Sequence, residues 1–491
     1  MTTNYFHFQD YTAQGLSQGV ITSSQGHFLT AQGLVGATLF ELIALENETE
    51  AFVFSMKGES VDLVLLTNTD CAPGTKVVRT GKHVTYPCTD KILGKAVNPL
   101  GIDILTHHRF QSEENRPLES PVRGISERAK ITEPFDTGIL IVDTLLPLGK
   151  GQRELLLGDR KTGKSQFALD TVVTQAKRGV ICIYAMIGKS QTATKQIAEY
   201  FAKQNVLGNI VIIATSPDDT AGLIHLTPFA AMTLAEYFCD QGKETTVILD
   251  DLTTHAKSYR QLSLLARRFP GRNAYPGDIF YLHSRLLERA GNFTQGKKSV
   301  SITCLPIAET QQADMTGYIQ TNLMSMTDGH LYFDADLFLE GHRPAVHPFV
   351  SVTRVGKQTK SPLLRETISE LTSFLSRTQR LEQVSHFGQE LSEEARGNLH
   401  KAAKLTFLFD LHTTGSWDSS FQFFLIALVW DGYWPNSELD VVEQDITKLL
   451  MLEKAHFYIK EELDKLLKSE SLAKAGKQAR IIADHTFAQF P

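Results

Sequence analysis

One stretch decides the fold of this 491-residue chain: Glu154-Leu155-Leu156-Leu157-Gly158-Asp159-Arg160-Lys161-Thr162-Gly163-Lys164-Ser165. Three consecutive leucines follow Glu154, and the last eight residues match the pattern GxxxxGK[ST] at every fixed position. This pattern is typical of a loop that wraps a phosphate group when a strand precedes it and a helix follows it. We therefore expect a strand, a phosphate-binding loop and a helix in that order.

The residue types of the loop suit phosphate. Gly158 and Gly163 allow the backbone to curl so that successive N–H groups point at phosphate oxygens, and the start of the next helix adds the positive end of its dipole. Lys164 can neutralise the β- and γ-phosphates, and the Ser165 hydroxyl can ligate Mg²⁺. The candidate nucleotide-binding residues are therefore Gly158, Asp159, Arg160, Lys161, Thr162, Gly163, Lys164 and Ser165.

The sequence after the loop argues against a chance glycine-rich turn. Apolar residues follow at a spacing that puts them on one face of a helix: Ala168, Leu169, Val172, Val173 and Ala176. Short apolar runs at 180–184, 210–213 and 246–249 then alternate with helical patterns. Strands that are apolar on both faces and alternate with helices indicate a parallel α/β sheet.

The two ends of the chain have other patterns. Residues from about 15 to 80 show short β-branched and aromatic stretches between turns, which indicates a small barrel or sandwich. A polar, proline-containing stretch at 112–117 predicts a surface loop. Beyond about residue 360 the pattern is helical. We therefore predict a β-barrel domain at 1–80, a nucleotide-binding domain at 81–358 and a helical domain at 359–491.

Composition excludes several classes of protein. Hydrophobic residues make up 42%, charged residues 21%, and the formal net charge is −6, which is typical of a globular protein without a general nucleic-acid-binding surface. The five cysteines form no CxxC pair and the sixteen histidines show no metal-site spacing, so we expect reduced thiols and no zinc. The longest apolar run, 421–430, is too short to cross a bilayer, and no secretory signal is evident.

Two acids follow the apolar run that ends at Leu249. A carboxylate at the carboxyl end of a strand beside a phosphate loop can hold Mg²⁺, usually through water. Asp250 is the stronger candidate and Asp251 the weaker, while an exposed turn or the start of a helix is the alternative for such a pair. Together with the phosphate loop, the position favours a role in metal binding.

A catalytic base is missing from its expected place. An enzyme that hydrolyses nucleotide must orient or activate water, often with a carboxylate or Gln near the γ-phosphate. In catalytic proteins of this architecture the acid follows the next core strand, but here the run at 181–187 is followed by Gly188, Lys189, Ser190 and Gln191. The pattern predicts a site that binds nucleotide without turning it over.

Three further segments reveal a resemblance. The block from Pro276 to Arg289 (PGDIFYLHSRLLER), the segment Thr353-Arg354-Val355-Gly356 and the stretch from Thr137 to Glu154 together resemble the alpha subunits of F-type ATP synthases. The resemblance is dense from about residue 124 to 360 and weaker toward both ends. It implies a small N-terminal β-barrel, a central α/β RecA-like P-loop domain and a C-terminal α-helical domain, in agreement with the three zones.

The resemblance also implies partners and ligands. Such subunits alternate with catalytic beta subunits in a hexameric ring around a gamma shaft, are held by a peripheral stalk, and couple MgATP or ADP to proton or sodium transport. The expected place is the cytoplasmic face of the inner membrane, peripheral to the membrane sector and without nucleic acid. Alpha subunits have Gln where beta subunits have the catalytic Glu; Lys189 here is likewise non-catalytic and could pair with phosphate.

Several site residues follow from the resemblance alone. Arg354 matches the arginine that alpha subunits extend to the beta active site, with a surface arginine as the alternative. Ser351 matches a residue of the same interface, as do Ser325 and Gly329, although ordinary turn packing competes for all three. Arg343-Pro344 matches the pair beside the adenine ring.

Departures from the family pattern suggest a divergent member from an alternative ion-pumping complex. Residues 411–415 lack the family's Gln-Gly-Gln segment, Gln320 replaces a proline, and residues 1–14 lack the amphipathic helix that holds a delta subunit. A self-sufficient catalytic ATPase is the alternative function, and Lys189 argues against it because those enzymes carry Glu there. A nucleic-acid translocase would need a basic N-terminal groove, which the first eighty residues do not provide.

Overall fold

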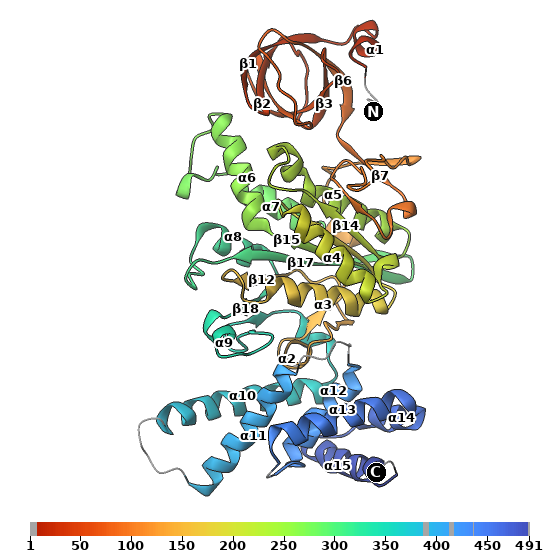
Figure 1. Ribbon diagram of the computed structural model, residues 1–491, viewed down its shortest axis with the longest axis vertical. Helices are drawn as coiled ribbons and strands as arrows, with labels where there is room; N and C mark the ends of the chain where they lie inside the picture. The colour runs from red at the N-terminus through yellow and green to blue at the C-terminus, as the bar shows by residue number, and fades with distance from the viewer. Residues whose placement is uncertain (1–6, 386–391, 412–416, 436, 490–491) are drawn as a thin grey trace. The chain divides into compact units, whose positions relative to one another are not determined.

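The computed structural model describes residues 7–385, 392–411, 417–435 and 437–489 (Figure 1). The chain divides into two compact units. The first comprises the described residues of Met1–Ala129, Ala176–Thr310 and Asp314–Thr327, and the second those of Lys130–Gln175, Gln311–Ala313 and Asp328–Pro491.

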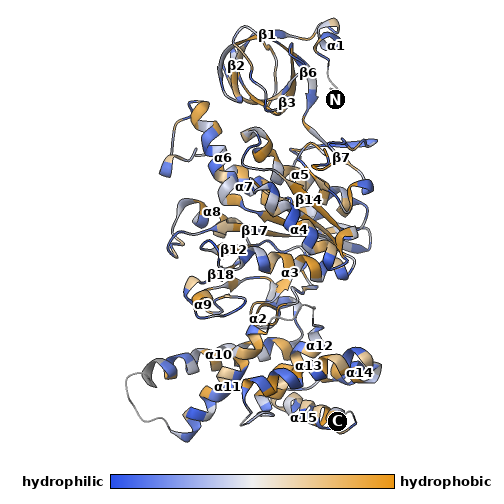
Figure 2. Cartoon of the chain, in the orientation of Figure 1, coloured by the Kyte–Doolittle hydropathy of each residue, from blue (hydrophilic) through white to orange (hydrophobic). Residues whose placement is uncertain are grey.

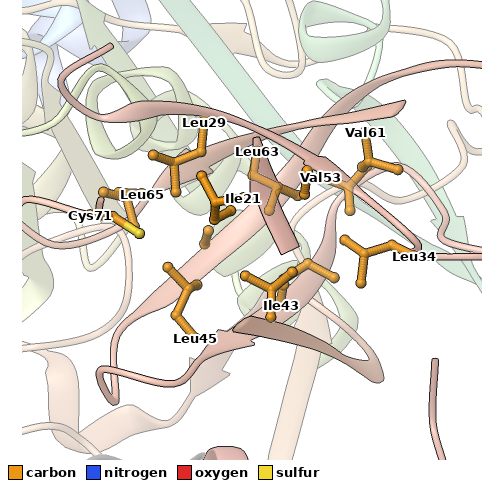
Figure 3. Packing of buried hydrophobic residues seen from close by; sticks show 13 residues of the cluster. Ile21, Leu29, Leu34, Ile43, Leu45, Val53, Val61, Leu63, Leu65 and Cys71 are labelled. Atoms are coloured by element: carbon orange, nitrogen blue, oxygen red, sulfur yellow. The ribbon is translucent and has the colours of Figure 1, made fainter. Parts of the chain in front are cut away.

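The first unit begins with a closed antiparallel barrel of six strands in the order β1-β2-β5-β4-β3-β6. Aliphatic side chains from every strand fill it, among them Ile21, Leu29 and Val53 (Figure 3). The prediction of a small barrel or sandwich therefore resolves as a barrel. Its strands are β1 (Gln18–Gln25), β2 (Phe28–Gln32), β3 (Glu41–Leu45), β4 (Glu50–Lys57), β5 (Ser60–Leu65) and β6 (Lys76–His83), and α1 (Phe8–Ala13) packs on it through Tyr11.

The rest of the first unit is a parallel sheet covered by helices, as the apolar runs predict. The strand order is β17-β15-β13-β14-β8, and β16 pairs antiparallel with β17. Strands β13 to β15 are buried along their whole length. The elements are β8 (Ala96–Val97), β13 (Ile181–Met186), α4 (Gln191–Lys203), β14 (Ile210–Ala214), α5 (Ala221–Asp240), β15 (Thr245–Asp250), α6 (Leu252–Leu265), α7 (Ile279–Leu287), β16 (Gly291–Gln295), β17 (Lys298–Glu309) and α8 (Tyr318–Met326).

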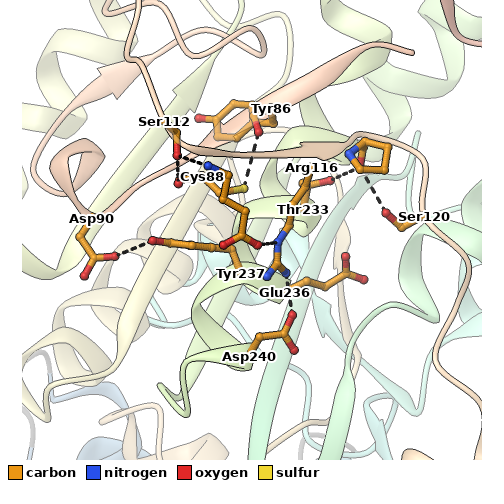
Figure 4. Close-up of polar contacts among 12 residues, drawn as sticks. Tyr86, Cys88, Asp90, Ser112, Arg116, Ser120, Thr233, Glu236, Tyr237 and Asp240 are labelled. Atoms are coloured by element: carbon orange, nitrogen blue, oxygen red, sulfur yellow. Dashed lines mark hydrogen bonds and ion pairs between the residues drawn. The ribbon is translucent and has the colours of Figure 1, made fainter. Parts of the chain in front are cut away.

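The predicted surface loop at 112–117 is partly wrong. It contains β9 (Glu114–Pro117), which pairs antiparallel with β7 (Thr85–Cys88) because its backbone groups find partners there despite the polar sequence. An ion pair fastens the ribbon to the end of α5: Nη1 of Arg116 lies 2.6 Å from Oδ2 of Asp240 (Figure 4). Nearby, the hydroxyl of Tyr237 donates to Asp90 at 3.2 Å.

The second unit holds a smaller sheet and the helical end of the chain. Strands β12 and β18 are parallel, and β19 pairs antiparallel with β18. The helical pattern beyond residue 360 is confirmed, and α10 and α11 carry both polar and apolar residues along their length (Figure 2). The elements are β10 (Pro134–Phe135), α2 (Leu140–Leu145), β11 (Leu148–Gly149), β12 (Glu154–Gly158), α3 (Lys164–Lys177), β18 (Gly329–Phe333), α9 (Ala335–Leu339), β19 (Val352–Thr353), α10 (Pro362–Ser385), α11 (Glu393–Asp410), α12 (Ser419–Asp431), α13 (Leu439–Ala455), α14 (Phe457–Leu466) and α15 (Leu472–Gln489).

Across the described ranges, none of the helices combines the length and apolar character needed to cross a membrane. The architecture as a whole is an N-terminal six-stranded barrel, a central α/β region and a C-terminal helical region. The fold class predicted from the sequence is confirmed.

Candidate functional site

The phosphate loop lies between β12 and α3, as the sequence predicts. β12 ends at Gly158 and α3 begins at Lys164. A Cβ atom at position 158 would collide with the backbone carbonyl of Phe333 on β18, so only glycine fits beside that strand. Gly163 has a φ of +92°, in the left-handed region that favours glycine. Both fixed glycines of the pattern therefore have a structural reason.

Lys164 is buried inside this loop. Its ammonium group donates to the carbonyl oxygens of Gly158 at 2.8 Å and Asp159 at 2.5 Å, and the side chain of Thr162 closes the same turn by donating to Asp159 at 2.8 Å. The Asp159 carboxylate accepts the backbone N–H of Ala313 at 3.1 Å. The ammonium group is therefore held in place by the loop's own backbone.

The remaining loop residues differ in exposure. Arg160, Lys161 and Ser165 are exposed, whereas Thr162 is buried. Lys161, which replaces the family's Gln, has a left-handed φ of +63°. The Ser165 hydroxyl lies at the start of α3, where the helix leaves N–H groups without partners inside the helix. A phosphate group is the kind of ligand that such a helix start accepts.

Arg343 lies on an aromatic ring that sequence analysis missed. Its guanidinium carbon is 3.5 Å from the centroid of the Phe338 ring, and its Nη1 donates to the Phe338 carbonyl oxygen at 2.8 Å. The Phe338 ring also approaches the phosphate loop, because its Cε2 would lie 3.9 Å from a Cβ at Gly163. Phe338 thus lies next to the loop, and Arg343, which Pro344 follows in the chain, stacks on its ring. The signal available in the sequence was an aromatic residue, Phe338, shortly before the Arg343-Pro344 pair.

Asp410 fixes the backbone on which Arg343 stands. The carboxylate lies 2.7 Å from Nδ1 of His342 and accepts the N–H of Arg343 at 3.3 Å. Burial raises the pKa of Asp410, against the hydrogen bond and charge of His342. The predicted departure at 411–415 falls almost wholly on 412–416, which lie outside the described residues.

Arg354 follows β19, and its side chain is exposed. Its backbone N–H donates to the carbonyl oxygen of Asp328 at 3.1 Å. The nearby Glu154 is fully buried and accepts a hydrogen bond from Gln152 at 2.7 Å. Burial raises the pKa of Glu154 well above its usual value, against the opposing effects of Gln152 and of the nearby Arg354 charge. The exposed Arg354 thus follows a strand end whose backbone is hydrogen-bonded.

The other predicted interface residues make packing contacts. The Ser351 hydroxyl accepts the N–H of Tyr332 on β18 at 2.9 Å. In the first unit, the Ser325 hydroxyl donates to Asn322 one turn earlier in α8, at 2.7 Å. A Cβ at Gly329 would collide with the Val352 carbonyl and with the Glu154 carboxyl group. Each residue therefore has a local structural reason beside any interface role.

In the first unit, Asp250 and Asp251 meet a partner that sequence analysis did not foresee. Nζ of Lys189 lies 2.9 Å from Oδ1 of Asp250 and 2.9 Å from Oδ2 of Asp251. The Tyr184 hydroxyl donates to Oδ2 of Asp250 at 2.9 Å. Burial lowers the pKa of Lys189, but the two carboxylates outweigh burial and raise it above its usual value. The lysine in the place of the catalytic acid is therefore a charged partner of both acids.

Comparisons with known sequences show which family this chain resembles along most of its length. The model of the ATP synthase alpha/beta family, nucleotide-binding domain, matches residues 138–353. ATP synthase subunit alpha of Acholeplasma laidlawii is 39% identical over 389 residues, which cover 79% of this chain and 78% of that protein. ATP synthase subunit alpha of Buchnera aphidicola subsp. Acyrthosiphon pisum (strain Tuc7) is 34% identical over 466 residues, 92% of this chain and 91% of that protein.

A third relative, ATP synthase subunit alpha of Clostridium acetobutylicum, is 39% identical over 375 residues, or 76% of this chain and 74% of that protein. These matches extend well beyond the phosphate loop, which many unrelated nucleotide-binding proteins share. The resemblance seen in the sequence is confirmed: the chain belongs to the alpha subunits of the ATP synthase alpha/beta family.

Proposed function

We propose that this chain is the non-catalytic, regulatory nucleotide-binding subunit of a rotary F-type ATP synthase. One observation carries the non-catalytic part: the residue after β13 at the usual place of the catalytic acid is Lys189, and its ammonium group faces two carboxylates. A protonated lysine cannot accept the proton of an attacking water. The site therefore binds nucleotide without hydrolysing it.

The ligand is ATP or ADP, bound through the residues from Gly158 to Ser165. Mg²⁺ would be held by the hydroxyl of Ser165, an oxygen donor of the kind that Mg²⁺ prefers, whereas Asp250, the other residue predicted for the metal, is already paired with Lys189. The ion would neutralise phosphate charge. Arg343 and Phe338 form a cation–π pair beside the loop, and we assign them, with Pro344, to the adenine ring.

Arg354 serves the neighbouring catalytic subunit. Its side chain is exposed at a strand end whose backbone is fixed by Asp328, so the guanidinium group can reach a ligand bound by another chain. A guanidinium group at the γ-phosphate stabilises the charge that spreads over its oxygens in the transition state. Ser351 supports this role by binding the β18 backbone.

The partners follow from the family. We infer catalytic beta subunits that alternate with this chain in a hexameric ring, a gamma shaft, a peripheral stalk and a membrane sector that moves protons or sodium ions. The complex would then lie on the cytoplasmic face of the cell inner membrane. The predicted domain limits at residues 80 and 358 remain a proposal: a barrel domain before residue 80, a nucleotide-binding domain up to residue 358 and a helical domain after it.

Single-turnover hydrolysis distinguishes this function from that of a self-sufficient ATPase. Rings would be reconstituted with beta subunits whose catalytic sites are disabled, and radiolabelled ATP would be added at less than the site concentration. We expect ATP to bind to this chain and to be recovered intact, since Lys189 stands where catalytic relatives carry the acid that acts as the base. Release of labelled phosphate at a rate that disappears with Lys164→Ala would show a catalytic site and overturn the proposal.

A further inference from the structure

The group of Lys189, Asp250 and Asp251, here called the Lys189 triad, is unusually complete. Both acids are almost fully buried, with side-chain exposures of 5% and 2%. The Lys189 ammonium lies 2.9 Å from an oxygen of each. The second oxygen of Asp250 accepts the Tyr184 hydroxyl at 2.9 Å, and the second oxygen of Asp251 accepts the N–H of Thr254 at 2.6 Å. Every carboxylate oxygen of the pair therefore already has a partner.

The charge of the Lys189 triad bears on cation binding. Two buried carboxylates without a cation would carry a charge of about −2 and attract a divalent ion strongly, because the low dielectric of the interior strengthens charge interactions. An ammonium group between them reduces this charge by one and uses one oxygen of each acid. A hydrated Mg²⁺ that approaches Asp250 must compete with an ion pair already formed inside the protein.

We propose that Lys189 takes the place of a divalent cation at Asp250 and Asp251, so that this chain binds ATP and ADP with little dependence on Mg²⁺. The inference rests on the proposed function for its nucleotide part. It concerns a residue in which this chain differs from the Gln that its family resemblance predicts. Mg²⁺ can still accompany the nucleotide, held by phosphate oxygens and the Ser165 hydroxyl, but Asp250 contributes little to holding it.

A direct contact between Lys189 and phosphate is the competing interpretation. It would make Lys189 matter more for ATP than for ADP, with or without Mg²⁺. The Lys189 triad instead predicts that removal of the lysine leaves both nucleotides similarly affected and creates a requirement for Mg²⁺. The first interpretation therefore predicts a change in the preference for ATP over ADP, and the second predicts a change in the dependence on Mg²⁺.

The experiment uses the full chain and two readouts. The first is the thermal unfolding midpoint with EDTA or with MgCl₂ and no nucleotide. The second is the Kd for ATP and for ADP under both conditions, by calorimetry. The variants are Lys189→Gln and, as the matched control, Lys195→Gln, which removes the same charge from an exposed position on α4. The double variant Lys189→Gln/Asp251→Asn keeps the net charge of the triad at about −1, in case two unpaired buried carboxylates prevent folding.

For the wild-type chain and Lys195→Gln we expect no effect of Mg²⁺ on the unfolding midpoint, and Kd values that differ by less than about threefold between the two conditions. For Lys189→Gln, or the double variant, MgCl₂ should raise the midpoint and tighten the Kd for both nucleotides at least about tenfold. A wild-type Kd that weakens about tenfold or more in EDTA would overturn the inference, as would a variant that remains insensitive to Mg²⁺. If no chain binds nucleotide, the proposed function fails, and the unfolding midpoints alone decide about Lys189.

Discussion

Two lysines follow parallel strands of this protein, and their ammonium groups contact different kinds of oxygen. Lys164, after β12, donates to the main-chain oxygens of Gly158 and Asp159, which belong to its own loop. Lys189, after β13, faces the carboxylates of Asp250 and Asp251, which follow it by some sixty residues in the chain. The first arrangement fixes the position of an ammonium group with neutral oxygens, and the second neutralises it with acids. A lysine that follows a strand of such a sheet is therefore not by itself a phosphate ligand.

Arg354 extends this comparison to an exposed cation, and it gives the largest expected effect. Arg354→Ala should lower steady-state ATP hydrolysis by reconstituted rings about 10³- to 10⁵-fold, because a guanidinium group supplied to a neighbouring active site acts mainly in the transition state. Arg354→Lys should rescue poorly, since an ammonium group lacks the planar fork that spans two phosphate oxygens. The affinity of this chain's own site for ATP should not change.

Assembly is the control for the Arg354 measurement. Gel filtration must show that variant rings have the size of wild-type rings before their turnover is compared. Assembled Arg354→Ala rings with near-normal turnover would mean that Arg354 is a surface residue without a role in hydrolysis.

The next effect separates the two lysines directly. Lys164→Ala should weaken ATP binding by the full chain about 10- to 100-fold, because it removes a charge-assisted contact to phosphate. Lys161→Ala removes an equal charge from an exposed position of the same loop and should change the Kd much less. Calorimetric titration of both variants checks this. Equal losses for both would show that only the overall charge of the loop matters.

The comparison also explains what the sequence could predict. The partners of Lys164 lie within six residues of it, so the eight-residue pattern contains nearly the whole arrangement. The strands buried on both faces and the amphipathic helices are equally local signals, and the predicted fold class follows from them. The phosphate loop, the strands and the helices could therefore be predicted because each depends on residues close together in the sequence.

The missed features depend on contacts between distant segments or on the path of an irregular turn. Nothing near Lys189 in the sequence indicates that it faces Asp250 and Asp251. The stacking of Arg343 on Phe338 needs the turn that follows α9, and the pairing of β9 with β7 needs a backbone match that a polar sequence hides. The interface serines could be named only by resemblance, because a hydroxyl group fits many turns.

Buried histidines in the first unit contrast with Lys189, because burial favours their uncharged form. His225, His255 and His283 form a stacked and hydrogen-bonded row inside this unit. Nε2 of His255 donates to the carbonyl oxygen of His225 at 3.1 Å, and Nδ1 of His255 shares a 3.1 Å hydrogen bond with Nε2 of His283. Burial disfavours the charged form of both rings, whereas two carboxylates stabilise the charge of Lys189.

Burial lowers the pKa of His255 to about 4, against the weaker opposing effects of the hydrogen bond to the His225 carbonyl oxygen and of the Asp251 charge. It also lowers the pKa of His225 and His283 well below the usual value, and the charges of the neighbouring histidines and, for His225, of Arg268 act in the same direction. Between about pH 6.5 and 4 the unfolded chain binds protons that the native chain does not, so stability falls with acidification. Each histidine contributes up to about 1.4 kcal/mol per pH unit in this window.

The thermal unfolding midpoint of the full chain between pH 7 and pH 5 measures this effect. We expect a decline that becomes shallower in His225→Phe, because the aromatic stack with Tyr259 persists while one titrating group is lost. His485→Gln, at an exposed position on α15, should keep the wild-type slope. A midpoint that is constant from pH 7 to pH 5 would contradict the assignment of neutral, buried rings.

The smallest effect concerns Ser351, whose partner again comes from another strand. Ser351→Ala leaves the buried N–H of Tyr332 without its 2.9 Å acceptor, and the loss of a buried hydrogen bond costs about 1–3 kcal/mol of unfolding free energy. Ser325→Ala removes a hydroxyl that bonds only within the exposed turn of α8, and it should change stability by less than about 0.5 kcal/mol. Because Ser351 ties β18 to the segment that carries Arg354, we expect turnover of assembled Ser351→Ala rings to fall a few-fold, far less than in Arg354→Ala. Denaturant unfolding and ring hydrolysis together decide between two roles. A loss of stability with a small loss of turnover assigns Ser351 to positioning. A large loss of turnover at unchanged stability would instead place its hydroxyl at the active site of the neighbouring subunit.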